Sequence, residues 1–240
     1  MSETQITSTE SSTDVMDKAK NIWSSYSKII IYGGSAVILL MLGWIGYQKF
    51  VKEPRELEAG ETIFMAENLF DKMSTSGFNK DSVNIVLNGG NLEGNSITGI
   101  LKVISKYDGT STADRARYIA GACYLQIGEY DKAIQNLKEF KGANAAQVKC
   151  KAFILMGHAY AEKNQVGEAM DNYKKAAEVN EKDEAVTPDA LMLCGNYAEA
   201  NGKNAEAAGF FTKLKDNFPT YIAVSNGEVD KHLARLGEFK

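Results

Sequence analysis

Hydrophobic and polar residues follow one another with the three-to-four spacing of amphipathic helices along most of this chain. The spacing is clearest in the second half, where apolar stripes are separated by short polar turns. Proline is scarce, with three in the whole chain, and none of them interrupts a periodic segment. The pattern predicts an all-α fold whose best-formed helical pairs lie at 113–141, 149–180 and 188–219.

A last helix is expected at 225–237, where it would cover the apolar side of the third pair. The spacing Ser225-x-x-Glu228 is that of a capping box, which marks a helix start. One pair earlier, Thr187 is expected to cap the helix that Pro188 opens. The apolar face of the last helix consists of Val229, Leu233 and Leu236.

Small, turn, small and bulky residues recur in a fixed order through the three pairs. Each pair has a glycine in its first helix, and these glycines are 36 and 38 residues apart. Each is followed by a turn residue after seven positions, an alanine after twelve and a bulky side chain after sixteen. The glycine lets two helices approach closely, and the turn residue permits the left-handed backbone that ends a helix. This repeat predicts a solenoid that binds other proteins. The sets are Gly121, Gly128, Ala133 and Leu137; Gly157, Asn164, Ala169 and Tyr173; and Gly195, Gly202, Ala207 and Phe211.

Residues 55–107 resemble a degenerate first helical pair. The segment 74–96 is rich in glycine and asparagine and is expected to be a long loop between the two helices. Such a loop is either functional or a tolerated insertion. Helical spacing before it is carried by Ala59, Ile63, Ala66, Phe70 and Met73, and after it by Ile100, Leu101, Ile104 and Tyr107.

Residues 29–47 contain no charged side chain, and at about 1.5 Å per residue they span about 28 Å, close to the thickness of a hydrocarbon core. We expect a transmembrane helix that stays as an anchor, because no cleavage site follows it. Residues 1–28 are expected to be disordered, apart from a short amphipathic lead-in through Val15, Ala19, Ile22 and Tyr26. Basic residues flank both ends, so the positive-inside rule gives no orientation.

Four small residues fall within one arc of the expected transmembrane helix. They would let another membrane helix approach closely, or they reflect the general abundance of glycine in membrane spans. These residues are Gly33, Ala36, Gly43 and Gly46.

Composition narrows the function classes. The hydrophobic content of 44% suits a packed core, and the net charge of −4, without a basic stripe, makes nucleic acid an unlikely partner. The cysteines Cys123, Cys150 and Cys194 lack C-x-x-C spacing and are interpreted as small core residues, with a Cys123–Cys150 disulfide left open for an oxidising compartment.

No catalytic residue, cofactor site or metal site is predicted. His158 and His232 have no second metal ligand at helical spacing, and no nucleophile elbow, zinc-protease or phosphate-loop motif occurs. The glycine cluster at Gly89, Gly90 and Gly94 has no preceding predicted strand, which argues against dinucleotide binding.

The segment YLQIGEYDKAIQNLKEF, residues 124–140, closely resembles the core of a tetratricopeptide repeat. Pro219 stands where that family often ends a repeat, whereas Arg117 occupies a position that is usually aromatic or aliphatic. Together with the anchor and the stretch ISKYDGTSTADRARYIAGACYLQIGEYDKAI, residues 20–240 resemble the YfgM-like single-pass tetratricopeptide proteins, especially those of Bacteroidetes-type bacteria.

This resemblance implies a right-handed α-solenoid in the periplasm, anchored in the bacterial inner membrane. It also implies an ancillary subunit of the SecYEG translocon that works beside a membrane-anchored prolyl-isomerase-like chaperone and touches emerging secreted chains. The alternatives are a scaffold for cytochrome c maturation or envelope assembly, a cytosol-facing import receptor, and, least favoured, an enzyme that depends on His158 or an acidic pair.

The resemblance also implies a binding groove lined by the first helix of each pair. The lysine, asparagine and arginine set that clamps a peptide carboxylate is missing, whereas Tyr118, Ile154 and Met192 offer one apolar contact per repeat. Each position is alternatively an ordinary surface residue. The candidate groove residues are Arg115, Tyr118, Gln126, Lys151, Ile154, His158, Glu162, Asp189, Met192, Asn196 and Glu199.

Overall fold

The computed structural model describes residues 10–238, and the chain forms two compact units, Met1–Pro54 and Arg55–Lys240. The first unit consists of helix α1 (Glu10–Tyr47) and a π-helical turn, η1 (Gln48–Lys52). Residues 10–14, expected to be disordered, are helical, because extending a helix that is already nucleated costs little. Residues 1–9 of that expectation lie outside the described residues, as do the side chains of Val15, Ala19 and Ile22.

The described part of the chain contains one helical stretch, near the N-terminus, that is long and apolar enough to cross a membrane. Its small residues leave open surface within the first unit. A Cβ atom placed on Gly33, Gly43 or Gly46 would meet nothing within 4 Å, and Ala36 is exposed. Within the described part of the first unit, no neighbouring side chain covers these glycines.

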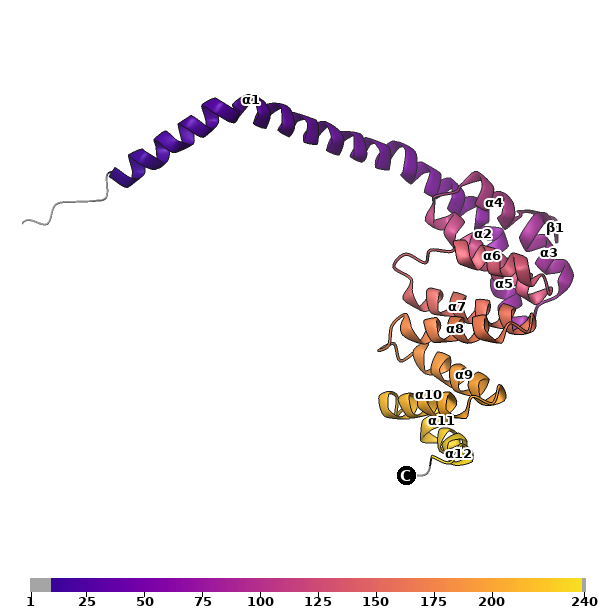
Figure 1. Ribbon diagram of the computed structural model, residues 1–240. Coiled ribbons are helices and arrows are strands. Elements are labelled where there is room, and N and C mark those ends of the chain that lie inside the picture. The colour runs from indigo at the N-terminus through magenta and orange to yellow at the C-terminus, as the bar shows by residue number, and fades with distance from the viewer. Residues whose placement is uncertain (1–9, 239–240) are drawn as a thin grey trace, which may run out of the picture. The chain divides into compact units, whose positions relative to one another are not determined.

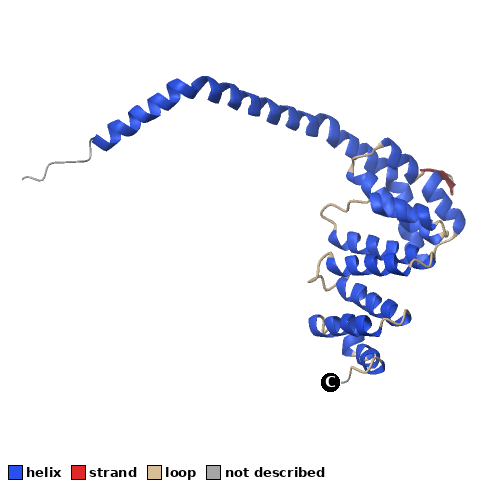
Figure 2. Cartoon of the chain, in the orientation of Figure 1, coloured by secondary structure: helices blue, strands red, loops and turns tan. Residues whose placement is uncertain are grey.

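The described part of the second unit is a series of antiparallel helical pairs that follow one another in chain order (Figure 1), with one small hairpin between helices (Figure 2). Its elements are α2 (Glu53–Ser76, of which residues from Arg55 onward belong to this unit), α3 (Lys80–Asn88), β1 (Gly89–Leu92), β2 (Asn95–Thr98), α4 (Ile100–Lys106), α5 (Ser111–Gln126), α6 (Tyr130–Glu139), α7 (Ala146–Glu162), α8 (Val166–Glu178), α9 (Thr187–Ala200), α10 (Asn204–Asn217), α11 (Ile222–Ser225) and α12 (Glu228–Arg235).

The repeat register read from the sequence describes how the pairs α5/α6, α7/α8 and α9/α10 pack. A Cβ atom on Gly121, Gly157 or Gly195 would overlap the bulky side chain sixteen residues later: Leu137, Tyr173 and Phe211 in turn. The turn residues Gly128, Asn164 and Gly202 all have positive φ, with values of 77°, 57° and 69°. The absent side chain and the left-handed turn thus bring each pair into contact.

Two hydrophobic clusters form the core. The N-terminal cluster joins α2, α3, β2, α4 and α5 and includes Ile63 and Cys123, both fully buried. The C-terminal cluster runs from α7 to α12 and includes Tyr173, Phe211 and Val229. Two smaller clusters around Ile134 and Leu137 link them through α6 and α7.

The segment 74–96 differs from the expected long loop. It contains α3 and most of a β-hairpin that ends at Thr98, in which Gly89 pairs with Thr98 and Leu92 with Asn95. Asn79 caps α3, with its Oδ1 accepting the Ser82 N–H at 2.8 Å, and Glu93 and Gly94 close the hairpin with φ values of 52° and 82°. The asparagines and glycines therefore serve as caps and turn residues of short elements.

Two expected helix starts also differ. The Ser225 hydroxyl donates to the Ile222 carbonyl, so Ser225 ends α11, and the Glu228 N–H is accepted by Asn226 Oδ1 instead. The Thr187 hydroxyl donates to the Asn180 carbonyl and therefore does not cap α9. In both places a local turn competes for the hydroxyl group. The apolar face of the last helix is as expected, with Val229 and Leu233 buried and Leu236 half-buried.

Candidate functional site

The eleven candidate groove positions lie on the first helices of the three pairs, α5, α7 and α9. Their apolar members are half-buried: Tyr118 packs between the N-terminal cluster and Leu137, whereas Ile154 and Met192 both pack against the C-terminal cluster. Tyr118 also lies against the Phe140 ring, with centroids 5.7 Å apart. Among the candidate groove residues, each pair therefore has one partly accessible apolar side chain.

Three charged candidates are bonded to neighbouring helices. Arg115 donates to Glu67 of α2 at 3.0 Å, Glu162 accepts from the Tyr130 hydroxyl at 3.2 Å, and Asp189 accepts from the Tyr221 hydroxyl at 2.6 Å. These side chains tie one pair to the next. They are less free than groove residues at the same positions were expected to be, because side chains of preceding elements bind Arg115 and Glu162, and Tyr221, which follows α10, binds Asp189.

Glu199 has a similar role at the end of the solenoid. Its carboxylate lies 2.6 Å from His232 Nδ1 and accepts a hydrogen bond from Arg235 Nε at 2.9 Å, and both partners belong to α12. The His232 ring stacks on Phe211, with centroids 4.5 Å apart. Glu199 therefore fastens the last helix to α9.

His158 faces the interior of its own pair. Its Nδ1 lies 2.9 Å from the Tyr173 hydroxyl, and the two rings meet edge to face. Burial lowers the pKa of His158 from its usual value, although the charge of Glu162 acts in the opposite direction. The imidazole is therefore held neutral in the folded protein.

Three polar candidates remain free for a ligand. Gln126, Lys151 and Asn196 are exposed, and within the described part of the chain none of them has a hydrogen-bond or ion-pair partner. They lie on α5, α7 and α9, one on each first helix.

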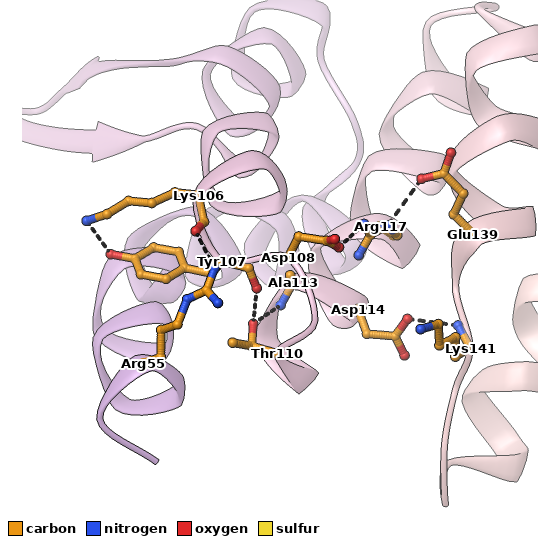
Figure 3. A network of polar contacts seen from close by, with 10 residues as sticks. All are labelled: Arg55, Lys106, Tyr107, Asp108, Thr110, Ala113, Asp114, Arg117, Glu139 and Lys141. Atoms are coloured by element: carbon orange, nitrogen blue, oxygen red, sulfur yellow. Dashed lines mark hydrogen bonds and ion pairs between the residues drawn. The ribbon is translucent and has the colours of Figure 1, made fainter. Parts of the chain in front are cut away.

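Arg117, which departs from the tetratricopeptide pattern, binds residues of two neighbouring segments, the turn after α4 and helix α6 (Figure 3). Its guanidinium bonds Asp108 at 2.6 Å and Glu139 at 3.3 Å, and these charges counter the effect of burial and raise the pKa of Arg117. Arg117 thus connects α5 through ion pairs to the turn after α4 and to α6.

Glu56 fastens α2 to the N-terminus of α5. Its carboxylate accepts four hydrogen bonds, from the backbone N–H and the hydroxyl of both Ser111 and Thr112, at 2.6 to 2.9 Å. Partial burial alone would raise the pKa of Glu56, but these hydrogen bonds outweigh it and lower the pKa. Thr110 adds the local cap, accepting the Ala113 N–H at 3.0 Å. The Glu56 carboxylate of α2 thus adds to the cap that Thr110 provides at the start of α5.

Beside this contact is an open pocket that sequence reasoning missed. We call it the α2 pocket; Glu56, Leu57, Gly60, Glu61, Phe64 and Arg115 line it. The apolar spacing that placed Ala59 and Ile63 in the core leaves Leu57 and Phe64 on another face of the helix. Two large apolar residues outside the core face were the available signal.

The described residues contain no group of three or more metal-ligating side chains. All three cysteines are free and buried, so the Cys123–Cys150 disulfide left open by the sequence is not formed. Burial raises the pKa of Cys123 and Cys194 to about 12 and that of Cys150 to about 11. None of these thiols is a reactive nucleophile.

Comparison with known proteins bears on the repeat region. Residues 154–222 match the tetratricopeptide repeat family, and no curated protein matches the chain. One similar solved structure, described as the MamA RS-1 ArsTM double mutant, shares 18% identity over 82% of this chain and 92% of that chain, with a TM-score of 0.44. The family match spans the second and third pairs with their glycine contacts, and the fold class is an all-α solenoid of tetratricopeptide type.

Proposed function

We propose that this chain is a membrane-anchored adaptor that holds a protein partner beside the bilayer. Tetratricopeptide repeats are protein-binding scaffolds, and the observation that carries the proposal is their match over residues 154–222. The half-buried side chains of Tyr118, Ile154 and Met192, one per pair, suit an extended segment or a partner helix. The anchor raises the local concentration of the repeats at the membrane, so weak contacts suffice.

The finer proposal is a periplasmic adaptor in the bacterial inner membrane, associated with the SecYEG translocon and a membrane-anchored prolyl-isomerase-like chaperone. The likeness of residues 20–240 to YfgM-like proteins supports it. An alkaline phosphatase fused to the C-terminus tests the orientation, because that enzyme is active only after export. An inactive fusion beside an active cytosolic reporter would reverse the orientation.

The partner is tested by photo-crosslinking in intact membranes. One photoreactive residue replaces Asn196, which is exposed and has no partner within the described residues. The matched control replaces Asp216, which is exposed on α10. The proposal expects adducts with SecYEG or the chaperone from Asn196 and not from Asp216. Adducts with cytochrome-maturation subunits alone would favour the rival scaffold, and equal labelling from both positions would count against a groove.

A further inference from the structure

In the second unit, exposed large apolar side chains are concentrated on α2. Within residues 55–238, which the structure describes, four such side chains are exposed by more than a third, and three of them, Leu57, Phe64 and Met65, belong to this helix. The Leu57 side chain is 67% exposed and that of Phe64 is 57% exposed. The fourth residue, Ile222, is 70% exposed and lies on α11. An apolar group gathered on one face marks an interaction surface, whereas scattered residues do not.

The shape of the α2 pocket suits a helix. Leu57 and Phe64 are two turns apart, about 10.5 Å along the axis, which is the spacing of successive anchor positions on a partner helix. Between them, a Cβ atom on Gly60 would meet nothing within 4 Å, so the glycine leaves a notch into which a partner side chain reaches. The start of α5 forms the other wall.

The charge of the pocket is negative. Glu61 is exposed and has no partner within the described residues, and hydrogen bonds hold Glu56 in its ionised form. The one cation of the lining, Arg115, is already bound by Glu67. Glu61 is therefore an unpaired carboxylate beside the apolar residues, whereas the Glu56 carboxylate is already bound by the start of α5.

We infer that the α2 pocket binds an amphipathic helix of a protein partner whose apolar face is flanked by lysine or arginine. Opposite charge attracts such a helix and aligns it. An isologous second copy would bring the same acidic pocket against itself, and an anionic bilayer surface would repel it. The inference goes beyond the proposed function, because Arg115 is the single candidate groove residue in this pocket.

Peptide binding to the full-length protein in phosphatidylcholine nanodiscs tests the charge argument. The probe is a synthetic helical peptide with leucine and phenylalanine two turns apart and lysines beside them; its counterpart has glutamate in place of lysine. We expect the lysine peptide to bind at least about tenfold more tightly, after subtraction of empty nanodiscs. Equal binding of the two peptides, or none, would overturn the inference.

Variants of the full chain locate the binding surface. Leu57→Ser, Phe64→Ser and Gly60→Leu should each weaken binding of the lysine peptide by about tenfold or more, since they remove an anchor or fill the notch. The matched control is Ile222→Ser, which removes a side chain that is 70% exposed on α11. Circular dichroism should show unchanged folding in all four. If the three variants bind as the wild type does, the pocket is not the site.

A photoreactive residue in place of Met65, which is exposed on α2 beside Phe64, leaves the notch at Gly60 open and distinguishes the occupants in intact membranes. Adducts with a basic amphipathic segment of another protein support the inference. Adducts with residues 55–76 of a second copy, adducts with lipid, or the absence of adducts overturn it. The groove is tested separately, by the photoreactive residue at Asn196. A negative result at one site therefore does not change the conclusion for the other.

Discussion

At the scale of single residues, the glycines of the first helices set how closely each pair packs. Gly157 meets the Tyr173 ring so closely that no added atom has room. We expect Gly157→Leu to lower the free energy of unfolding by about 1 to 3 kcal/mol through overpacking. Chemical denaturation of wild type and variant measures it.

Gly167 provides the matched control for that substitution. It lies in α8, and a Cβ atom there would meet nothing within 4 Å. Gly167→Ala should therefore leave stability unchanged or raise it by up to about 1 kcal/mol through helix propensity. An unchanged Gly157→Leu protein would show that the repeat contact does not constrain the pair.

His158 makes stability depend on pH. Its pKa is lowered in the folded protein, so between the folded and ordinary values the unfolded chain binds more protons. The contribution of neutral His158 to the free energy of unfolding is complete above about pH 6.5, the ordinary pKa of histidine. It is lost as the pH falls from there towards the lower pKa of the folded state. His158→Gln should reduce the slope of the free energy of unfolding against pH. Chemical denaturation of wild type and variant at pH values from 7.5 to 5 measures the difference. Parallel profiles would contradict the assignment.

At the scale of elements, the contact between α2 and α5 depends on Glu56. Glu56→Ala removes the acceptor of four hydrogen bonds at the start of α5 and should cost about 1 kcal/mol, the size of a lost helix cap. Glu61→Ala, a neighbouring exposed carboxylate without a partner, should stay within about 0.5 kcal/mol of the wild type. Equal losses in the two variants would indicate a general charge effect of α2.

The sequence predicts those elements whose contacts lie within one repeat. A glycine and the bulky residue sixteen positions later meet inside a pair, so their register is visible in the chain. The hairpin was missed because its turn places Glu93, which is not a typical turn residue at this position, in a left-handed conformation. The ties of Arg115 and Glu199 were missed because their partners, Glu67 and Arg235, lie in other pairs, 48 and 36 residues away.

At the scale of the molecule, we expect the two large clusters to behave as separate cooperative units, because only the two smaller clusters join them. Phe211 is fully buried in the C-terminal cluster, and Phe211→Ala should cost about 3 to 5 kcal/mol. Hydrogen exchange should then accelerate in α7–α12 more than in α2–α5, because repeat arrays unfold by neighbouring segments.

The reciprocal variant lies in the other cluster. Ile63, also fully buried, belongs to the N-terminal cluster, and Ile63→Ala should accelerate exchange in α2–α5 first. The same uniform acceleration across residues 55–238 in both variants would show that the domain unfolds as a single unit.

The three buried thiols have a practical consequence for experiments on this chain. Their burial and raised pKa values keep them protonated at physiological pH, so we expect them to react slowly with disulfides and alkylating reagents. A cysteine introduced at an exposed position such as Lys151 or Gln126 would be the reactive one. The unmodified sequence is thus a ready background for attaching spin labels or fluorophores in an oxidising or a reducing compartment.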